Sequence, residues 1–408
     1  MNISPIDNFE LLFPDNSGFD KTDILFYSGK NDLCSLYLSA ENKRNRLFVT
    51  DTNIAPLCTD FISHFTDENA DNIKAPSIFK KGNDTLCILG AGEKYKTIEN
   101  VLEIVRAALN SNFNRNCLFV AIGGGVLSDM TGFAASMFKR GVDVEFVPTT
   151  LLSDVDASIG GKTGCDFDSY KNMIGAFYHA KKIHIWSSFI QSLPQNEFIS
   201  GLGEVVKTAF LFSPELTEIL KTQKEKVMSR NEEVLQKIIT ICAKAKAKTV
   251  HEDFKEKGIR AYLNYGHTFG HALETVAGLG KISHGEAVAW GIGRALGLSL
   301  DKNLCSAEFA NECKSILFDY GFCTDPLPQI IKDIPNATLA LVSAMHKDKK
   351  NSGSCVKVIL QKTGQSTFIT FQPQFCIDFV ISRRAGCSIE LNTTLPFCGR
   401  FKTERIAM

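Results

Sequence analysis

Residues 117–148 read CLFVAIGGGVLSDMTGFAASMFKRGVDVEFVP, and this stretch decides the fold class. The apolar run at residues 117–122 predicts a buried strand that stops at three consecutive glycines. A helix is expected next, and VDVEFV at residues 142–147 predicts a second strand, which Pro148 ends. A strand, a crossover helix and a strand in this order indicate a parallel sheet covered by helices.

The same alternation continues toward the N-terminus, where RLFVT at residues 46–50 and LCIL at residues 86–89 predict two more strands, followed by an amphipathic helix at about residues 97–109. From about residue 196 to residue 320 the apolar residues recur at helical spacing instead, so we expect a domain boundary near Pro194. The helices expected in the second half cover residues 198–211, 232–251, 267–277 and 284–300, and a hairpin is expected at residues 355–360 and 366–371 around Thr363 and Gly364.

Length and composition narrow the class of protein. The chain has 408 residues, which suggests two domains because single cores stop growing at about 250–300 residues. Lys plus Arg number 45 and Asp plus Glu number 45, and such a neutral chain is poorly suited to nucleic acid or to an anionic membrane surface. The 13 cysteines form no CxxC pair, which favours reduced thiols in the cytoplasm over a disulfide framework. The sequence shows neither a signal peptide nor an apolar run of roughly 20 residues, so neither secretion nor a membrane span is expected.

The glycine turn at residues 123–126 (GGGV) joins a buried strand to the start of a helix. Glycines let backbone amides approach a phosphate, and a helix N-terminus favours negative charge, but a tight structural turn is an equally good interpretation. Asp51 and Asp129 can accept hydrogen bonds from cofactor hydroxyls, although such residues more often begin a helix or a turn. Thr149 and Thr150, at the end of the next strand, can serve a cofactor or cap the following helix.

Four of the eight histidines lie in a short span: His251, His267, His271 and His284. His267 and His271 are four residues apart and therefore share one face of a helix, which suggests that they are joint metal ligands. Glu204, in the small-residue context GLGEVVK, offers a carboxylate. Three protein ligands would leave a position open for substrate or water. The alternative is a pair of core or surface histidines.

Basic residues recur beside glycines and polar residues. A substrate with a carboxylate and a phosphate would need such a set, whereas any one of these residues taken alone is more often a solvated charge. Lys207 stands out because it lies three residues after Glu204, on the same helical face. The set comprises Arg140, Lys162, Lys171, Lys207, Arg260, Lys349 and Lys350.

Six motifs then carry a resemblance to a known family. They are GGGVLSDMTGFAASMFKRGVDVEFVPTTLLSDVDASIGGKTG from residue 123, KNMIGAFY from 171, GLGEVVK from 201, RAYLNYGHTFGHALE from 260, SHGEAVA from 283 and MHKDKKNSG from 345. In order and approximate spacing they resemble the 3-dehydroquinate synthases, which belong to the sugar-phosphate cyclase superfamily. The likeness covers roughly residues 51–371.

The resemblance implies an α/β protein with an N-terminal Rossmann-like parallel-sheet domain that binds NAD (residues 1–193). A mostly helical domain for metal and substrate follows (residues 194–371), with the active site between the two. It also implies a homodimer. Residues 372–408 form a C-terminal extension beyond the usual family length, and no role is assigned to them.

The resemblance also implies site residues. The metal, zinc or cobalt, would be held by Glu204, His267 and His284, so that His271 would contact substrate phosphate or assist catalysis instead. Cofactor positions would be Asp51, Glu93, Lys96, Gly123, Gly124, Gly125, Val126, Asp129, Thr149, Thr150, Lys171 and Ser187. Substrate and catalytic positions would be Arg140, Asp156, Lys162, Asn172, Lys207, Lys246, Arg260, Asn264, His271 and Lys349.

The activity that the resemblance implies converts 3-deoxy-D-arabino-heptulosonate 7-phosphate into 3-dehydroquinate and phosphate, in the shikimate pathway. In this family NAD oxidises a substrate carbinol, phosphate is eliminated, hydride returns, and an internal aldol reaction closes the ring. Three alternatives are weighed beside it. They are a related cyclase that acts on an amino analogue or another sugar phosphate, a metal-dependent alcohol dehydrogenase, and a non-catalytic binding protein on the same fold.

Overall fold

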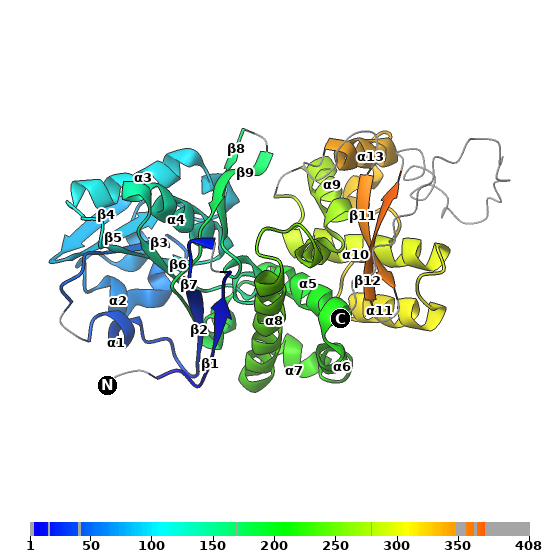
Figure 1. Cartoon of the computed structure of the whole chain (residues 1–408), viewed down its shortest axis with the longest axis horizontal. Coiled ribbons are helices and arrows are strands. Elements are labelled where there is room, and N and C mark those ends of the chain that lie inside the picture. Colours follow the sequence, from blue (N-terminus) through cyan, green and yellow to red (C-terminus); the bar gives the residue numbers. More distant parts are fainter. Residues whose placement is uncertain are drawn as a thin grey trace.

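The computed structural model describes residues 4–14, 17–39, 42–168, 170–278, 280–347, 356–362 and 365–371. Figure 1 shows two halves: a sheet with its helices, and a group of helices with a small hairpin. The strands are β1 (Asp7–Leu12), β2 (Lys21–Tyr27), β3 (Arg46–Asp51), β4 (Ser77–Lys81), β5 (Asp84–Leu89), β6 (Leu118–Gly123), β7 (Asp143–Pro148), β8 (Lys162–Phe167), β9 (Tyr170–Phe177), β10 (Lys182–Trp186), β11 (Val356–Lys362) and β12 (Gln365–Phe371). The helices are α1 (Leu33–Tyr37), α2 (Thr59–Ile62), α3 (Ile98–Asn110), α4 (Gly125–Met137), α5 (Gln195–Phe212), α6 (Pro214–Thr222), α7 (Lys224–Met228), α8 (Glu232–Glu252), α9 (His267–Ala277), α10 (His284–Asp301), α11 (Ala307–Asp319), α12 (Gln329–Lys332) and α13 (Ala337–Lys347).

The central sheet has eight strands within the described residues, in the order β1-β2-β10-β7-β6-β3-β5-β4. Every neighbouring pair from β2 to β5 is parallel, which confirms the predicted parallel sheet. The edge strands β1 and β4 pair antiparallel, and the sequence pattern did not reveal them.

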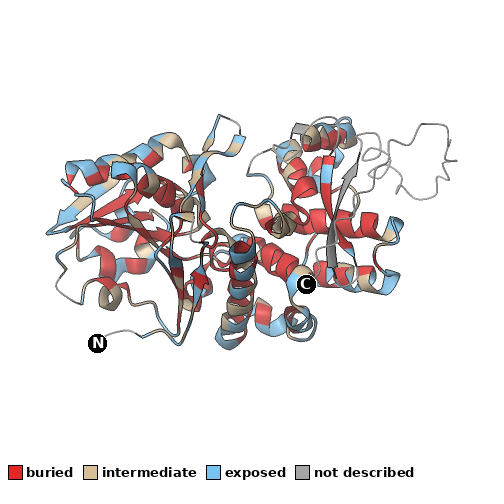
Figure 2. Ribbon diagram, viewed as in Figure 1, coloured by how far each residue is buried: buried red, intermediate tan, exposed pale blue. Residues whose placement is uncertain are grey.

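Alternate residues of the inner strands serve two separate apolar cores, one on each face of the sheet. On β3, Leu47 and Val49 belong to the core beneath α3 and α4, whereas Phe48 belongs to the core beneath α1 and α2. Successive side chains of a strand point to opposite faces, so a strand covered on both faces is apolar throughout. Figure 2 shows these strands as almost wholly buried.

The order of the strands reverses between β3 and β6. From β3 the chain runs outward to β5, and α3 then returns it to β6 on the other side of β3. Ligands of doubly wound sheets bind at such a switch point, outside the carboxyl ends of the strands. Asp51 ends β3 and Gly123 ends β6, so two positions predicted for a cofactor lie at this crevice.

The helical half is built on close contact between α5 and α10. A Cβ added to Gly203 of α5 would lie 2.3 Å from the carbonyl oxygen of Gly285, and one added to Gly285 would lie 1.7 Å from that of Ser200. Only glycine allows this approach, and it brings the start of α10 against the middle of α5. The predicted helices of this half are confirmed, and α9 has the bounds expected from the sequence.

Two hairpins lie outside the central sheet. The predicted β11–β12 pair is antiparallel, and Thr363 and Gly364 lie outside the described residues. The β8–β9 hairpin was not predicted; it packs mainly on α4 and carries Lys162, Lys171 and Asn172. Among the described helices, none is long and apolar enough to cross a membrane.

Candidate metal centre and active site

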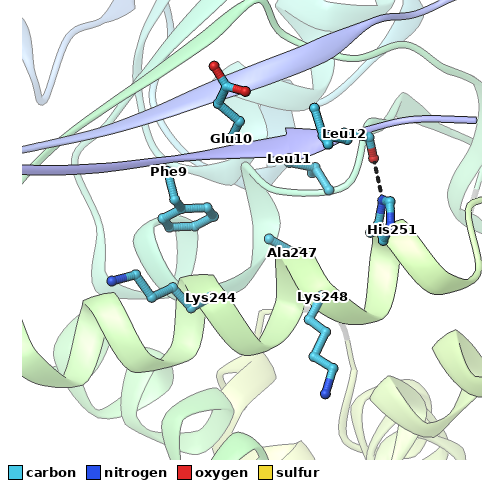
Figure 3. A pocket seen from close by; sticks show the side chains of 8 residues that line it. All are labelled: Phe9, Glu10, Leu11, Leu12, Lys244, Ala247, Lys248 and His251. Atoms are coloured by element: carbon cyan, nitrogen blue, oxygen red, sulfur yellow. Dashed lines mark hydrogen bonds between the residues drawn. The ribbon is translucent and has the colours of Figure 1, made fainter.

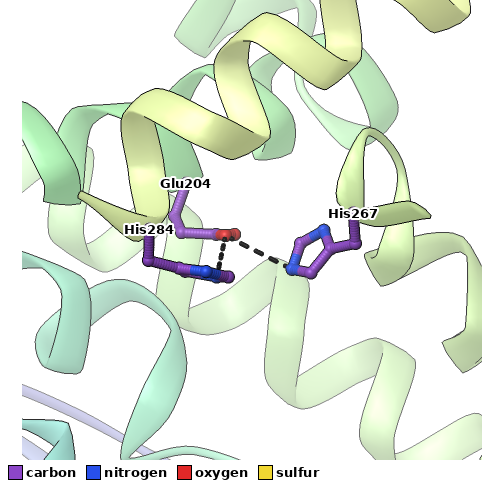
Figure 4. Close-up of side chains that lie close together, drawn as sticks. All are labelled: Glu204, His267 and His284. Atoms are coloured by element: carbon purple, nitrogen blue, oxygen red, sulfur yellow. Dashed lines mark ion pairs between the residues drawn. The ribbon is translucent and has the colours of Figure 1, made fainter. Parts of the chain in front are cut away.

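Three side chains from three helices converge at the start of α10. Glu204 lies in the middle of α5, while His267 and His284 are the first residues of α9 and α10. The Nε2 atoms of His267 and His284 each lie 3.5 Å from Oε1 of Glu204 (Figure 4). One atom from each residue lies within 4.8 Å of the other two, which is close enough for all three to hold one ion.

The second ring nitrogen of each of these histidines faces an oxygen. Nδ1 of His267 lies 3.1 Å from the carbonyl oxygen of Tyr265. A carbonyl can only accept, so Nδ1 carries the proton and Nε2 keeps its lone pair for a metal. Nδ1 of His284 faces Glu274, with Oε2 at 3.6 Å. This donor set, one carboxylate and two imidazoles, fits zinc or cobalt.

The carboxylate of Glu204 is buried and ionised. Burial alone would raise its pKa, but the Lys207 ammonium and the neighbouring His284 lower it to about 2. Lys207 forms an ion pair with Glu204 and lies 3.6 Å from Oδ1 of Asp156. The proximity of Lys207 to Glu204 that the sequence predicted is therefore present.

Asp156 links the sheet half to the helical half. It lies in a π-helical turn, Ser153–Ala157, and its Oδ1 accepts from Lys246 of α8 at 2.8 Å. Lys246 also donates to the backbone carbonyl of Asp156 at 2.6 Å. Burial lowers the pKa of Lys246 to about 8, against the opposing effect of Asp156. The Lys246 ammonium is therefore held by Asp156, the same carboxylate that faces Lys207 of the cluster.

A second carboxylate, that of Glu256, contacts two of the predicted substrate residues. It forms an ion pair with Lys162 of β8 and accepts from Asn264 Nδ2 at 2.7 Å. The buried Arg260 donates to the carbonyl oxygen of Gly160 at 2.7 Å, so it also connects the two halves. Sequence reasoning missed Glu256, which has a left-handed φ of 56° in a turn without regular period.

His271 and Glu274 lie beside the metal cluster. With His267 they occupy positions i, i+4 and i+7 of α9, and therefore one face. His271, Glu274 and His284 form a second group whose ligand atoms lie within 4.8 Å of one another. Glu274 is buried and accepts from Lys171 at 3.0 Å. Sequence reasoning missed Glu274 too, although its spacing from His267 was a usable signal.

Predicted cofactor residues line the carboxyl edge of the sheet. Lys96 is buried; its ammonium lies 2.7 Å from Asp129 Oδ2 and donates to Asn172 Oδ1 at 2.6 Å. Thr149 and Ser187, at the ends of β7 and β10, bury hydroxyls with no hydrogen-bond partner among the described residues. Buried hydroxyls without partners fit a polar ligand at this edge.

The glycine turn is also a tightly packed structural turn. A Cβ on Gly124 would lie 3.1 Å from Thr150 Cγ2, and one on Gly125 would lie 3.0 Å from Ala157 Cβ. Asp51 accepts from the amide of Asn53 at 2.9 Å, and Thr150 accepts from that of Ser153 at 3.2 Å. The first turn of α4 receives no side-chain cap, and the first amides of a helix, which have no intrahelical partner, can bind an anion.

The remaining predicted positions differ in where they lie. Glu93 is exposed in the turn after β5, and Val126 is in the first turn of α4. Arg140 is exposed just beyond the far end of α4, about 20 Å from the glycine turn at 1.5 Å per residue. None of the hydrogen bonds or ion pairs found among the described residues joins Arg140 to the cluster. Lys349 lies outside the described residues.

His251 is separate from the other three clustered histidines. It lies in a groove between β1 and α8, where its Nδ1 is 2.9 Å from the carbonyl oxygen of Leu12 (Figure 3). Phe9, Lys244 and Lys248 also line this groove. None of the residues that line it is a predicted site residue.

The chain has a doubly wound sheet with a glycine turn at its switch point, and its helical half presents a Glu–His–His cluster. These features define a class of enzymes that combine an α/β half with a helical half. Family comparison specifies which one. The model for "3-dehydroquinate synthase N-terminal" matches residues 86–200, and the model for "3-dehydroquinate synthase C-terminal" matches residues 201–351. The chain belongs to the 3-dehydroquinate synthase family.

Individual relatives agree with this assignment. The chain is 40% identical to the 3-dehydroquinate synthase of Sulfurovum sp. (strain NBC37-1) over 71% of its own length and 78% of the relative's. It is 37% identical to that of Acidithiobacillus ferrooxidans (strain ATCC 53993 / BNL-5-31) over 82% of its own length and 87% of the relative's. Among solved structures, 2-deoxy-scyllo-inosose synthase complexed with carbaglucose-6-phosphate, NAD+ and Co2+ matches with a TM-score of 0.75 and 22% identity, covering 92% of this chain and 99% of that one. The last match supports the fold.

Proposed function

We propose that the chain is a 3-dehydroquinate synthase, which converts 3-deoxy-D-arabino-heptulosonate 7-phosphate into 3-dehydroquinate and phosphate. Family membership carries the reaction class. The observation that carries the site is the convergence of Glu204, His267 and His284 on one point, with Lys207 and Lys246 beside it. A simple binding protein on this fold would have no need of that arrangement.

The proposed cofactors are NAD and one divalent ion, zinc or cobalt. The metal would be held by Glu204, His267 and His284, and NAD by the carboxyl edge of the sheet around Asp129 and Thr149. When bound, NAD takes and returns a hydride, and the metal polarises the substrate oxygen at the reacting carbon. The presence of NAD+ and Co2+ in the related inosose synthase supports this pair.

The substrate would be held by the cations that join the two halves. Lys162, Arg260 and Lys246 would bind its carboxylate and phosphate by charge-assisted hydrogen bonds. Asp156 orients Lys246 and Lys207, and Glu256 orients Lys162 and Asn264. Much of the rate would come from this positioning, with the substrate phosphate available as a base for the proton next to the ketone.

Assembly and location follow from the same proposal. We propose a homodimer, because the substrate role expected of Arg140 requires a second copy of the chain to supply it. We also propose that residues 1–193 and 194–371 are separate domains, and that the protein is cytoplasmic. The cysteines within the described residues are all unpaired, which supports a reducing compartment.

Phosphate release tests the reaction. Mixing the protein with 3-deoxy-D-arabino-heptulosonate 7-phosphate, NAD and a divalent metal should release inorganic phosphate, with no net gain of absorbance from NADH. Folded, metal-loaded protein that releases no phosphate would exclude this substrate. Accumulation of NADH in proportion to substrate consumed would indicate an alcohol dehydrogenase instead. Faster release from an amino analogue would indicate a related cyclase.

A further inference from the structure

Glu274 is a buried carboxylate for which the proposed reaction has no assigned use. It lies on α9, its side chain is 6% exposed, and it faces Lys171 and His284, which come from different parts of the chain. Lys171 donates to its Oε1 at 3.0 Å, while its Oε2 lies 3.6 Å from Nδ1 of His284. Burial of an ionised carboxylate is costly unless partners compensate it, so both contacts matter to its position.

The two metal-binding histidines are held in the same way. His267 directs Nδ1 to the backbone oxygen of Tyr265, and His284 directs Nδ1 to the carboxylate of Glu274. In each ring Nδ1 faces an oxygen outside the cluster, while Nε2 faces the point shared with Glu204. Outer carboxylates of this kind fix the ring orientation and raise the basicity of a ligating histidine.

Lys171 extends this link into the sheet half. It lies on β9, in the hairpin that also carries Lys162 and Asn172. The ammonium of Lys171 therefore connects a hairpin of the first half to a metal ligand of the second half through one carboxylate. A shift of the hairpin would change how Glu274 holds His284.

We propose that Glu274 is a positioning residue for the metal ligand His284, and that Lys171 fixes the Glu274 carboxylate so that the β8–β9 hairpin is coupled to the metal centre. This inference rests on the proposed metal site. A competing interpretation uses His271, Glu274 and His284 as a second metal site. The two interpretations differ in the number of ions that each chain binds, and metal stoichiometry therefore separates them.

Metal affinity tests the proposal without using activity. Full-length protein is stripped of metal, and the Zn2+ dissociation constant is measured at neutral pH by competition with a chromophoric chelator. Glu274→Gln should weaken binding by about 10–100-fold, as loss of an outer carboxylate does elsewhere. Glu274→Asp should recover part of the loss, and Lys171→Gln should weaken binding by a few-fold. Glu204→Gln, which removes a ligand, should lose more than any of these.

The matched control is Glu145→Gln, because Glu145 is also a carboxylate that faces a histidine nitrogen, His184 Nε2 at 3.3 Å, but far from the cluster. Its metal affinity should equal that of the unaltered protein. If Glu274→Gln binds within about twofold of the unaltered protein while Glu204→Gln does not, the inference is wrong and the metal site stands. If Glu204→Gln also keeps its affinity, the proposed metal site itself is wrong. Two ions per chain that become one in Glu274→Gln would make Glu274 a ligand and overturn the inference. Should Glu274→Gln not fold, Glu274→Asp and Lys171→Gln measure the same link, and unchanged affinity in both would refute it.

Discussion

Two buried histidine sites, one in each half of the molecule, use similar groups for different ends. In the sheet half, Nδ1 of His184 lies 2.9 Å from the hydroxyl of Tyr27, and Nε2 lies 3.3 Å from Glu145. The carboxylate must accept, so Nε2 donates and Nδ1 accepts from the tyrosine. Tyr37 donates to the same carboxylate at 3.1 Å. Every polar atom of His184 is thus used by a neighbour.

In the helical half, the Nε2 atoms of two histidines instead face one carboxylate oxygen. His267 and His284 each direct Nδ1 to an oxygen outside the cluster, and both Nε2 atoms lie 3.5 Å from Oε1 of Glu204. The difference teaches that burial of a histidine does not identify a ligand. What marks a candidate ligand is a ring nitrogen that faces the same point as the donor atoms of other residues.

The largest expected effect comes from removing one histidine from each site. His284→Ala should abolish metal retention and lower turnover by more than about 100-fold, since a ligand matters more than the outer groups that orient it. His184→Ala should keep metal affinity and instead lose about 1–3 kcal/mol of unfolding free energy, because Glu145 and Tyr27 lose their buried partner. Mass spectrometry measures the metal content of each variant, and urea unfolding measures its stability. Full metal occupancy in His284→Ala would show that His284 is not a metal ligand and does not differ from His184 in this respect.

A second test concerns the frame that holds the helical site. Gly203→Ala would push a methyl against the Gly285 carbonyl, next to His284, so we expect a loss of about 1–3 kcal/mol of stability together with weaker metal binding. The matched control is Gly293→Ala on α10, where the new Cβ meets Leu317 Cδ1 at 3.9 Å and fits. That variant should be neutral or stabilised by up to about 1 kcal/mol. Equal melting temperatures for the two variants would contradict the proposed close contact.

The sequence predicted the buried elements better than the exposed ones. The inner strands β3, β5, β6 and β7 are rich in buried apolar residues, and their positions were predicted to within about two residues. The edge strand β1 alternates exposed and half-buried residues, and β9 is largely exposed, so neither gave an apolar run to detect. Their pairing depends on neighbours far along the chain.

The candidate site was predicted by resemblance more than by spacing. Spacing alone paired His267 with His271, because both lie on one helical face. The sequence also offered Glu204 as a carboxylate, but spacing did not put His284 in place of His271, because the position of His284 depends on the glycine contact between α5 and α10. Glu256 and Glu274 were missed for the same reason: their partners, Lys162 and Lys171, lie on a hairpin that local sequence did not reveal.

A pH titration sharpens the comparison, because the helical site holds a lysine that titrates near neutrality. The pKa of Lys246 is about 8, below its ordinary value of 10.5, chiefly through burial. Its charge is lost as pH rises through about 8, so KM for an anionic substrate should rise there, by at most about tenfold per pH unit. Between about pH 8 and 10.5 the unfolded chain binds more protons, so this group alone makes stability rise with pH. Lys246→Arg should flatten the KM profile; an unchanged profile would assign it to another group.

The smallest expected effect is on the unfolding free energy at low pH, and it comes from Glu145 in the sheet half. Burial alone would raise the pKa of Glu145, but the hydrogen bonds from His184 and Tyr37 lower it below the ordinary 4.5. The ionised form therefore stabilises the fold above about pH 4.5, and this contribution is lost as pH falls through the lower pKa of the folded state. Glu145→Gln should reduce the acid dependence of the unfolding free energy by about 1 kcal/mol or less. The control is Glu218→Gln, which should not change it, because the Glu218 carboxylate is 63% exposed. Urea unfolding at several pH values measures this, and an equal slope in all three proteins would show that His184 and Glu145 do not depend on each other as the geometry implies.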